Sequence, residues 1–187
     1  MALAGKNYAS DNRLGQGPFQ DSMFNPGAIY DKIQKSEQRG VLKVIKMEVK
    51  TVTADQGGNF LVLLMDDEEK KVLPISIGPL EAQAIALVLQ GETPPRPLTH
   101  DLLKTVCENL KGALEKVVIT DIKESTFYAE IYLQQNGETI IIDSRPSDAI
   151  ALALRFEAPI YMTTKMIEFT YDYQDIIARE GGDEELH

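Results

Sequence analysis

The sequence contains a single cysteine, Cys107, so no disulfide bond can form within the chain. Cys107 stands among Leu103, Val106 and Leu110, a pattern that predicts a small buried side chain rather than a nucleophile. No apolar run approaches the roughly 20 residues that a membrane-spanning helix needs, and residues 1–10 lack the apolar stretch of a secretory signal. We therefore expect a protein of the reducing cytoplasm, with no membrane partner.

Clusters of basic residues are also absent from the sequence, and the net charge is −10. Proteins that bind nucleic acids usually present a basic surface that displaces counterions from phosphates. A nucleic-acid site must therefore be assembled locally by the fold, helped by a metal ion or by subunit assembly. The His-Glu-x-x-His, paired Cys-x-x-Cys, P-loop and Rossmann glycine patterns are missing, so the chain has none of these common signatures of metal and nucleotide sites.

The 187 residues, 43% of them hydrophobic, suit one domain with tails. Residues 1–40 are rich in polar residues, glycine and proline, which predicts a largely irregular N-terminal arm with a short helix near residues 28–38. We expect the folded domain over residues 41–168, and an acidic C-terminal tail over residues 169–187.

Within the domain, β-branched and apolar runs alternate with helical segments and turn signals. Thr99 is the expected N-cap of the second helix, Gly112 its stop, and Asn136-Gly137 a hairpin turn. We expect strands at 41–54, 60–65, 71–77, 115–123, 126–134, 138–143 and 159–162, helices at 80–90, 99–111 and 146–156, and helical structure from 165.

This order of elements predicts an α+β fold with an antiparallel or mixed sheet and three main helices, since hairpin turns imply antiparallel pairing. The segment Ala-Ile-Ala-Leu at 84–87 recurs at 149–152, each time after a strand and a proline. The order β-β-β-α then occurs in both halves of the domain, which suggests an internal duplication. The Ala- and Leu-rich stretch after Asp148 is expected to pack in the core.

Polar residues stand where helices begin or strands end in three segments, at 78–82, 96–103 and 143–155. The second contains Arg-Pro-Leu-Thr-His-Asp-Leu, and the third reads Asp-Ser-Arg-Pro-Ser-Asp-Ala-Ile-Ala-Leu-Ala-Leu-Arg. Together with Leu-Pro-Ile, Phe-Tyr-Ala and Ala-Pro-Ile in the same order, these motifs make residues 42–166 resemble the bifunctional nuclease domain family. Plant members of that family are described as acting on RNA and DNA, so the resemblance implies a nuclease.

The same residues offer the parts that phosphodiester hydrolysis needs: an activated water and compensation of phosphoryl charge. The catalytic candidates are His100, which titrates near neutrality, with Asp101 and Asp148. Planar guanidinium groups clamp phosphates well, and a hydroxyl can assist them. The phosphate-binding candidates are Arg96, Arg145 and Ser147, and the candidate ligands of Mg²⁺ or Mn²⁺, which prefer oxygen donors, are Glu81, Asp143 and Asp148.

Structural roles compete with each of these assignments. Asp101 and Glu81 stand in first helical turns, where a carboxylate complements the helix dipole without any catalytic role. Arg145 could pair with a carboxylate of its own turn. The alternative function is a non-catalytic regulatory or binding module that assembles as an oligomer. Under both functions we expect a homodimer or higher homo-oligomer, because a small α+β sheet has edges to cover.

Overall fold

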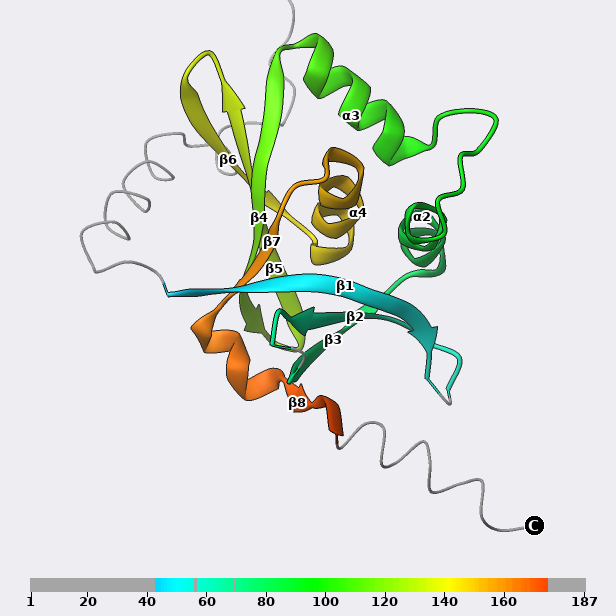
Figure 1. Ribbon diagram of the computed structural model, residues 1–187, viewed down its shortest axis with the longest axis vertical. Helices are drawn as coiled ribbons and strands as arrows, with labels where there is room; N and C mark the ends of the chain where they lie inside the picture. Colours follow the sequence, from blue (N-terminus) through cyan, green and yellow to red (C-terminus); the bar gives the residue numbers. More distant parts are fainter. Residues whose placement is uncertain (1–42, 56, 69, 175–187) are drawn as a thin grey trace, which may run out of the picture. The chain divides into compact units, whose positions relative to one another are not determined.

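The computed structural model describes residues 43–55, 57–68 and 70–174. Their strands form an eight-stranded sheet in the order β6-β5-β4-β7-β1-β2-β3-β8 (Figure 1). Neighbouring strands are antiparallel except for β4 and β7, which are parallel. The strands are β1 (Val44–Ala54), β2 (Phe60–Asp66), β3 (Lys71–Ile77), β4 (Gly112–Lys123), β5 (Thr126–Gln135), β6 (Glu138–Ser144), β7 (Ile160–Thr163) and β8 (Tyr171–Asp172).

Three α-helices, α2 (Pro79–Leu89), α3 (Thr99–Asn109) and α4 (Pro146–Phe156), lie on one side of this sheet, and a 3₁₀ helix, η1 (Thr164–Phe169), follows β7 (Figure 1). Helix α4 contacts both other α-helices and packs on β4 and β5, whereas α2 packs on β1 and β2. The mixed sheet and the three main helices confirm the predicted α+β class.

Two antiparallel meanders, β1-β2-β3 and β4-β5-β6, make up most of the sheet, and β7 lies between them. Each meander leads into a helix whose first residue is proline, Pro79 in α2 and Pro146 in α4. Proline suits this position because its fixed φ matches the helix and no amide partner is lost. The expected β-β-β-α order therefore occurs twice along the chain.

The core lies between the sheet and the helices, and α4 is its most buried helix. Ala149, Ile150, Ala151 and Ala153 are fully buried, which confirms that the Ala- and Leu-rich stretch packs in the core. Small residues there let the helix approach β4 and β5 closely. Close approach fixes the position of the α4 N-terminus relative to the sheet.

Several predicted boundaries need correction. The N-cap of α3 is Leu98 rather than Thr99, because the Asp101 carboxylate accepts a hydrogen bond from the Leu98 amide at 2.8 Å and starts the helix one residue earlier. Gly112 does not stop α3. The helix ends at Asn109, Lys111 adopts a left-handed φ of 60°, and Gly112 already begins β4.

Cys107 is half-buried against the core rather than fully buried, and its apolar neighbours on α3 are exposed. The expected helix near residues 28–38, the rest of the N-terminal arm and residues 175–187 of the acidic tail lie outside the described residues. No helix among residues 43–174 is long and apolar enough to span a membrane.

Candidate functional site

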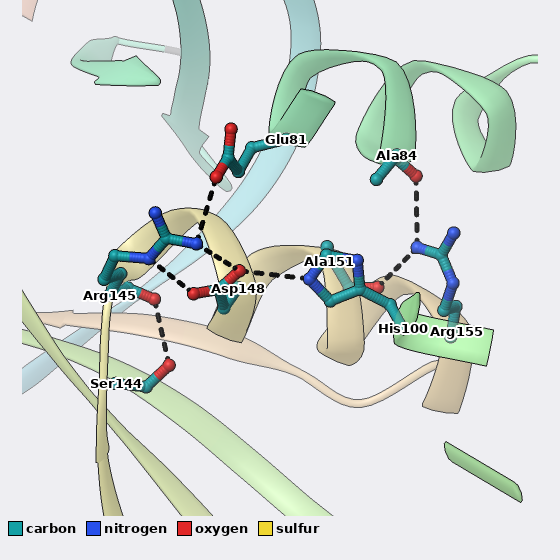
Figure 2. Close-up of polar contacts among 8 residues, drawn as sticks. All are labelled: Glu81, Ala84, His100, Ser144, Arg145, Asp148, Ala151 and Arg155. Atoms are coloured by element: carbon teal, nitrogen blue, oxygen red, sulfur yellow. Dashed lines mark hydrogen bonds and ion pairs between the residues drawn. The ribbon is translucent and has the colours of Figure 1, made fainter. Parts of the chain in front are cut away.

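Polar side chains at the starts of α2, α3 and α4 form one connected chain of contacts (Figure 2). It runs from Glu81 of α2 through Arg145, which precedes α4, to Asp148 of α4 and His100 of α3. Arg145 donates to Asp148 through Nε at 2.7 Å and Nη2 at 3.0 Å, and Nη2 also lies 3.0 Å from Oε1 of Glu81. The fold thus brings together four of the predicted site residues, and we call this set the helix-start network.

His100 is buried at the start of α3, and its Nε2 lies 3.1 Å from Oδ1 of Asp148. An ionised carboxylate can only accept hydrogen bonds, so Nε2 carries the proton in this pair. In a neutral imidazole the lone pair then lies on Nδ1, which makes no hydrogen bond to a described residue. The contact with Asp148 therefore leaves Nδ1 as the basic nitrogen of His100.

The Asp148 carboxyl is held in its ionised form. Burial alone would raise its pKa, but hydrogen bonds and positive charge from Arg145, with the contact to His100, outweigh burial and lower the pKa below the ordinary value. The hydrogen bond and charge of Asp148 raise the pKa of Arg145 in turn. Arg145 is largely exposed, and its Nη1 makes no bond to a described residue. It can therefore donate to an incoming anion.

Asp101 belongs to a different cluster, which it forms with Arg155 near the C-terminal end of α4. Its Oδ1 accepts a hydrogen bond from Nε of Arg155 at 2.5 Å. The Arg155 side chain is only 5% exposed, and its Nη1 donates to the carbonyl oxygens of Ala84 and Ala151 at 3.1 and 2.9 Å (Figure 2). Asp101 thus joins α3 to α4 and, through Arg155, to α2. Arg155 was missed as a site residue in the sequence, although it ends the longest motif.

The remaining predicted residues do not join the helix-start network in the structure. Arg96 is exposed in the loop before α3 and forms no ion pair with a residue that the structure describes. Ser147 is buried in the first turn of α4, with 7% of its surface exposed, which leaves its hydroxyl little access to a ligand. Asp143 is exposed on β6, where its cross-strand partner is Glu130 of β5.

The predicted metal ligands Glu81, Asp143 and Asp148 do not form a shared site in this arrangement. The Arg145 guanidinium lies between Glu81 and Asp148, where a shared cation would bind, and Asp143 is not in contact with either. Over residues 43–174, as described, no group of three or more His, Cys, Asp or Glu side chains is close enough to hold a metal ion.

A cavity of about 520 Å³ lies between the end of α2, the following loop and α3. Asp101, Lys104 and Arg155 line it, whereas His100, Arg145 and Asp148 do not. The candidate site residues therefore fall into two clusters. In the helix-start network Arg145 is exposed and His100 is buried, whereas the Asp101–Arg155 pair borders the cavity.

Gly78, the N-cap of α2, is the residue that lets Glu81 reach Arg145. A Cβ atom at position 78 would overlap Oε2 of Glu81, so a larger residue would push the carboxylate aside. Glycine leaves this space through the absence of a side chain rather than through an unusual φ, which is −77°.

The lowered carboxyl pKa values make acid stability a test of the two clusters. Asp101 is partly buried, which raises its pKa, but the hydrogen bonds from Arg155 and the Leu98 amide and the charge of Arg155 outweigh burial and lower the pKa below its ordinary value. A carboxyl whose pKa is lower in the folded state stabilises the fold above its unfolded pKa, about 3.9, and this contribution is lost as the pH falls through the folded value. We expect the free energy of unfolding to decrease below about pH 4.

The measurement is urea unfolding of the wild type and of the Asp148→Asn variant at a series of pH values. The variant should lose less stability between neutral and acidic pH, since its amide does not titrate. Identical pH dependence in the two proteins would contradict the assignment of Asp148 as a stabilising ionised group.

Together, the sheet and the three converging helix starts define an α+β domain with a composite polar site on its helical side. The sequence model of the bifunctional nuclease domain matches residues 62–171, and the chain belongs to this family. The match covers β3, α2, α3 and α4, and hence every residue of the helix-start network.

Individual relatives agree with this assignment. An uncharacterized protein of Mycobacterium tuberculosis is 43% identical over 118 residues, which cover 63% of this chain and 70% of the relative. Bifunctional nuclease 1 of Oryza sativa subsp. japonica is 31% identical over 109 residues, and bifunctional nuclease 2 of Arabidopsis thaliana is 28% identical over 116. These matches cover 57% and 56% of this chain but only 33% and 35% of the plant proteins.

Proposed function

We propose that this protein is a nuclease that hydrolyses phosphodiester bonds in RNA, DNA or both, with the helix-start network as its active site. The observation that supports this most directly is the hydrogen bond between His100 and Asp148, which leaves Nδ1 of the imidazole with a lone pair. Membership of the bifunctional nuclease domain family and the names of the plant relatives point to the same chemistry.

In this proposal His100 acts as the general base. Its Nδ1 takes a proton from the water that attacks phosphorus, and the ionised Asp148 stabilises the imidazolium that forms. The bond from phosphorus to the leaving oxygen breaks, and the imidazolium returns its proton to that oxygen. Arg145, with Nη1 directed away from its two carboxylate partners, donates to a phosphoryl oxygen (Figure 2). The N-terminal ends of α2 and α4 add partial positive charge beside Arg145. Asp148 is a positioning residue, because it acts through His100 and Arg145.

Metal assistance by Mg²⁺ or Mn²⁺ stays a prediction from sequence, and no step above depends on it. Glu81, Arg145 and Asp148 carry one excess negative charge, which opposes the approach of a polyanion. A divalent cation arriving with the nucleic acid would reduce that repulsion. A cytoplasmic location, inferred from the lone Cys107, is likewise proposed.

The experiment is cleavage of end-labelled single-stranded RNA and DNA by the purified full-length protein, in Mg²⁺, Mn²⁺ or EDTA. We expect the wild type to cleave at least one substrate. The Arg145→Ala variant should lose about 10–100-fold in kcat/KM, the usual range for a charged hydrogen bond to a phosphoryl group. Cleavage that continues in EDTA would show that no divalent cation is required. The proposed roles of His100, Arg145 and Asp148 would not be affected by that result.

Lys50→Ala is the control for loss of one positive charge, because Lys50 is exposed on β1, outside the network. It should change kcat/KM by less than about twofold. Equal losses in both variants would mean that Arg145 contributes only to the overall charge. Absence of wild-type cleavage under all conditions would favour the non-catalytic binding module instead.

A further inference from the structure

Strand β6 ends the sheet with one unpaired edge. All seven of its residues, Glu138–Ser144, pair with β5 on one side. On its other side β6 pairs with no strand of residues 43–174. An exposed strand edge presents free N–H and C=O groups that favour pairing with another strand.

The edge at the opposite end of the sheet is less open to pairing with another strand than β6 is. There β8 covers the first two residues of β3, and Lys71 forms an ion pair with Asp172 at 2.8 Å. The uncovered part of β3 contains Pro74, whose nitrogen has no hydrogen to donate. Strand β6 has no proline, glycine or lysine, and its centre reads Thr-Ile-Ile-Ile.

The face of β6 that lies on the helical side of the sheet is also uncovered. Ile140 and Ile142 are 39% and 38% exposed, although their cross-strand partners, Leu133 and Ile131 of β5, belong to the core. Cross-strand partners point to the same face of a sheet. The core surface therefore continues onto β6 and ends there without a covering element among the described residues.

We propose that a second copy of this chain pairs with β6, antiparallel and centred on Ile141, so that two sheets join into one. In this register Ile141 lies opposite its own copy and Ile140 lies opposite Ile142. Thr139 lies opposite Asp143, and Glu138 opposite Ser144. Apolar residues thus meet apolar ones, polar residues meet polar ones, and no like charges face each other.

The neighbouring registers lack this complementarity. A pairing centred on Ile140 places Glu138 opposite Ile142, and one centred on Ile142 places Asp143 opposite Ile141. Both put a carboxylate against an isoleucine and leave more of the strand unpaired. The sequence of β6 therefore selects a two-fold symmetric partner, which is the commonest arrangement in homodimers.

Helix α3 supplies further apolar surface at the same end of the sheet. The Gln135 side chain at the end of β5 donates to the carbonyl oxygen of Leu110, which follows α3, at 2.7 Å. The axis of an antiparallel pair of identical strands is perpendicular to the sheet, so the helices of both copies lie on one side. The apolar side chains exposed on α3 are Leu102, Leu103 and Val106, and Leu110 directly after the helix is exposed as well.

Cysteine cross-linking of the full-length chain tests the register. In a Cys107→Ser background, Ile141→Cys places the two sulfur-bearing residues directly opposite, with Cα atoms about 4.5–5.5 Å apart, a distance that a disulfide accepts. Thr139→Cys is the matched control on the same face. Its two copies would be separated by four residue positions, about 13 Å along the strand, beyond the reach of a disulfide.

Under mild oxidation we expect a covalent dimer from Ile141→Cys and none from Thr139→Cys alone. A mixture of Thr139→Cys and Asp143→Cys proteins should cross-link to each other, since these positions are opposite in the proposed register. Cross-linking of Thr139→Cys as efficient as that of Ile141→Cys would overturn the proposal.

Light scattering on the unlinked protein gives the second measurement. The wild type should be a dimer, and Ile142→Lys should weaken association about tenfold or more, because symmetry places the lysine in two cross-strand pairs. Val44→Lys, a change at a comparably exposed apolar position on β1, should remain a dimer. A monomeric wild type that dimerises only after removal of residues 1–40 would make the N-terminal arm the occupant of β6 and overturn the proposal.

Discussion

Replacing Asp148 with asparagine is expected to lower kcat for nucleic-acid cleavage about a thousandfold, within the range attributed to a positioned acid–base group. The amide keeps the shape of the side chain but loses its charge. It no longer fixes the proton on Nε2 of His100, which lies 3.1 Å from the carboxylate, and it no longer stabilises an imidazolium. Arg145 loses its two charged hydrogen bonds to the same group.

A double-mutant cycle separates positioning from independent catalysis. We expect His100→Ala to cause a loss similar to that of Asp148→Asn. The double variant should be no worse than the poorer single one, because both changes disable the same proton transfer. Steady-state kinetics on the substrate cleaved by the wild type supply all four rates. If the losses of kcat in the two single variants multiply in the double variant, Asp148 acts on the substrate separately from His100.

Asp143→Asn is the matched control, since it makes the same chemical change five residues earlier, on an exposed position of β6. Its kcat should stay within about threefold of the wild type if the helix-start network is the active site. A loss comparable to that of Asp148→Asn would instead support the metal site predicted from the sequence. Thermal unfolding of each variant ensures that rates are compared between folded proteins.

The sequence was sufficient to predict the elements because local signals agreed with the fold. Proline at the first position of α2 and α4, alternation in the strands and the Asn136-Gly137 turn each specify backbone conformations directly. The β4–β5 hairpin has no such signal at its turn. Glu124 and Ser125 adopt left-handed φ values of 49° and 61° there, imposed by the long pairing of the two strands.

The site was predictable only in part, because sequence identifies ionisable side chains but not their partners. His100, Arg145 and Asp148 were candidates from the sequence and lie in contact with one another, whereas Arg96, also a candidate, does not join them. Asp101 follows His100 directly but points about 100° further around α3 and meets Arg155 instead. Which carboxylate pairs with which arginine depends on how α3 and α4 cross. That crossing is set by long-range packing, which no local pattern encodes.

Because Asp101 pairs with Arg155 rather than with the helix-start network, we expect its replacement to affect stability more than catalysis. Asp101→Ala is expected to lower the free energy of unfolding by about 2–4 kcal/mol, because it leaves the charge of Arg155 without a partner. Only 5% of the Arg155 side chain is exposed, so water cannot readily replace the carboxylate. The change also removes the acceptor of the Leu98 amide at the start of α3. Urea unfolding at neutral pH measures the loss.

Glu108→Ala is the control on the same helix, since Glu108 forms an exposed ion pair with Lys104 at 3.7 Å and lines the same cavity. It should change stability by less than about 0.5 kcal/mol, as exposed helical ion pairs do. Under conditions where Asp101→Ala remains folded, its kcat should stay close to that of the wild type. A large loss of kcat there would restore Asp101 to the catalytic role predicted from the sequence.

Removing both members of the pair distinguishes an unpaired charge from simple loss of packing. Arg155→Met keeps most of the apolar stem of the side chain while eliminating the charge. If the main cost of Asp101→Ala is the uncompensated guanidinium, adding Arg155→Met should recover part of the stability. Recovery will be incomplete, because the carbonyl oxygen of Ala84 loses the Arg155 donor. Additive losses would mean that the contacts between α3 and α4 depend on packing rather than on this ion pair.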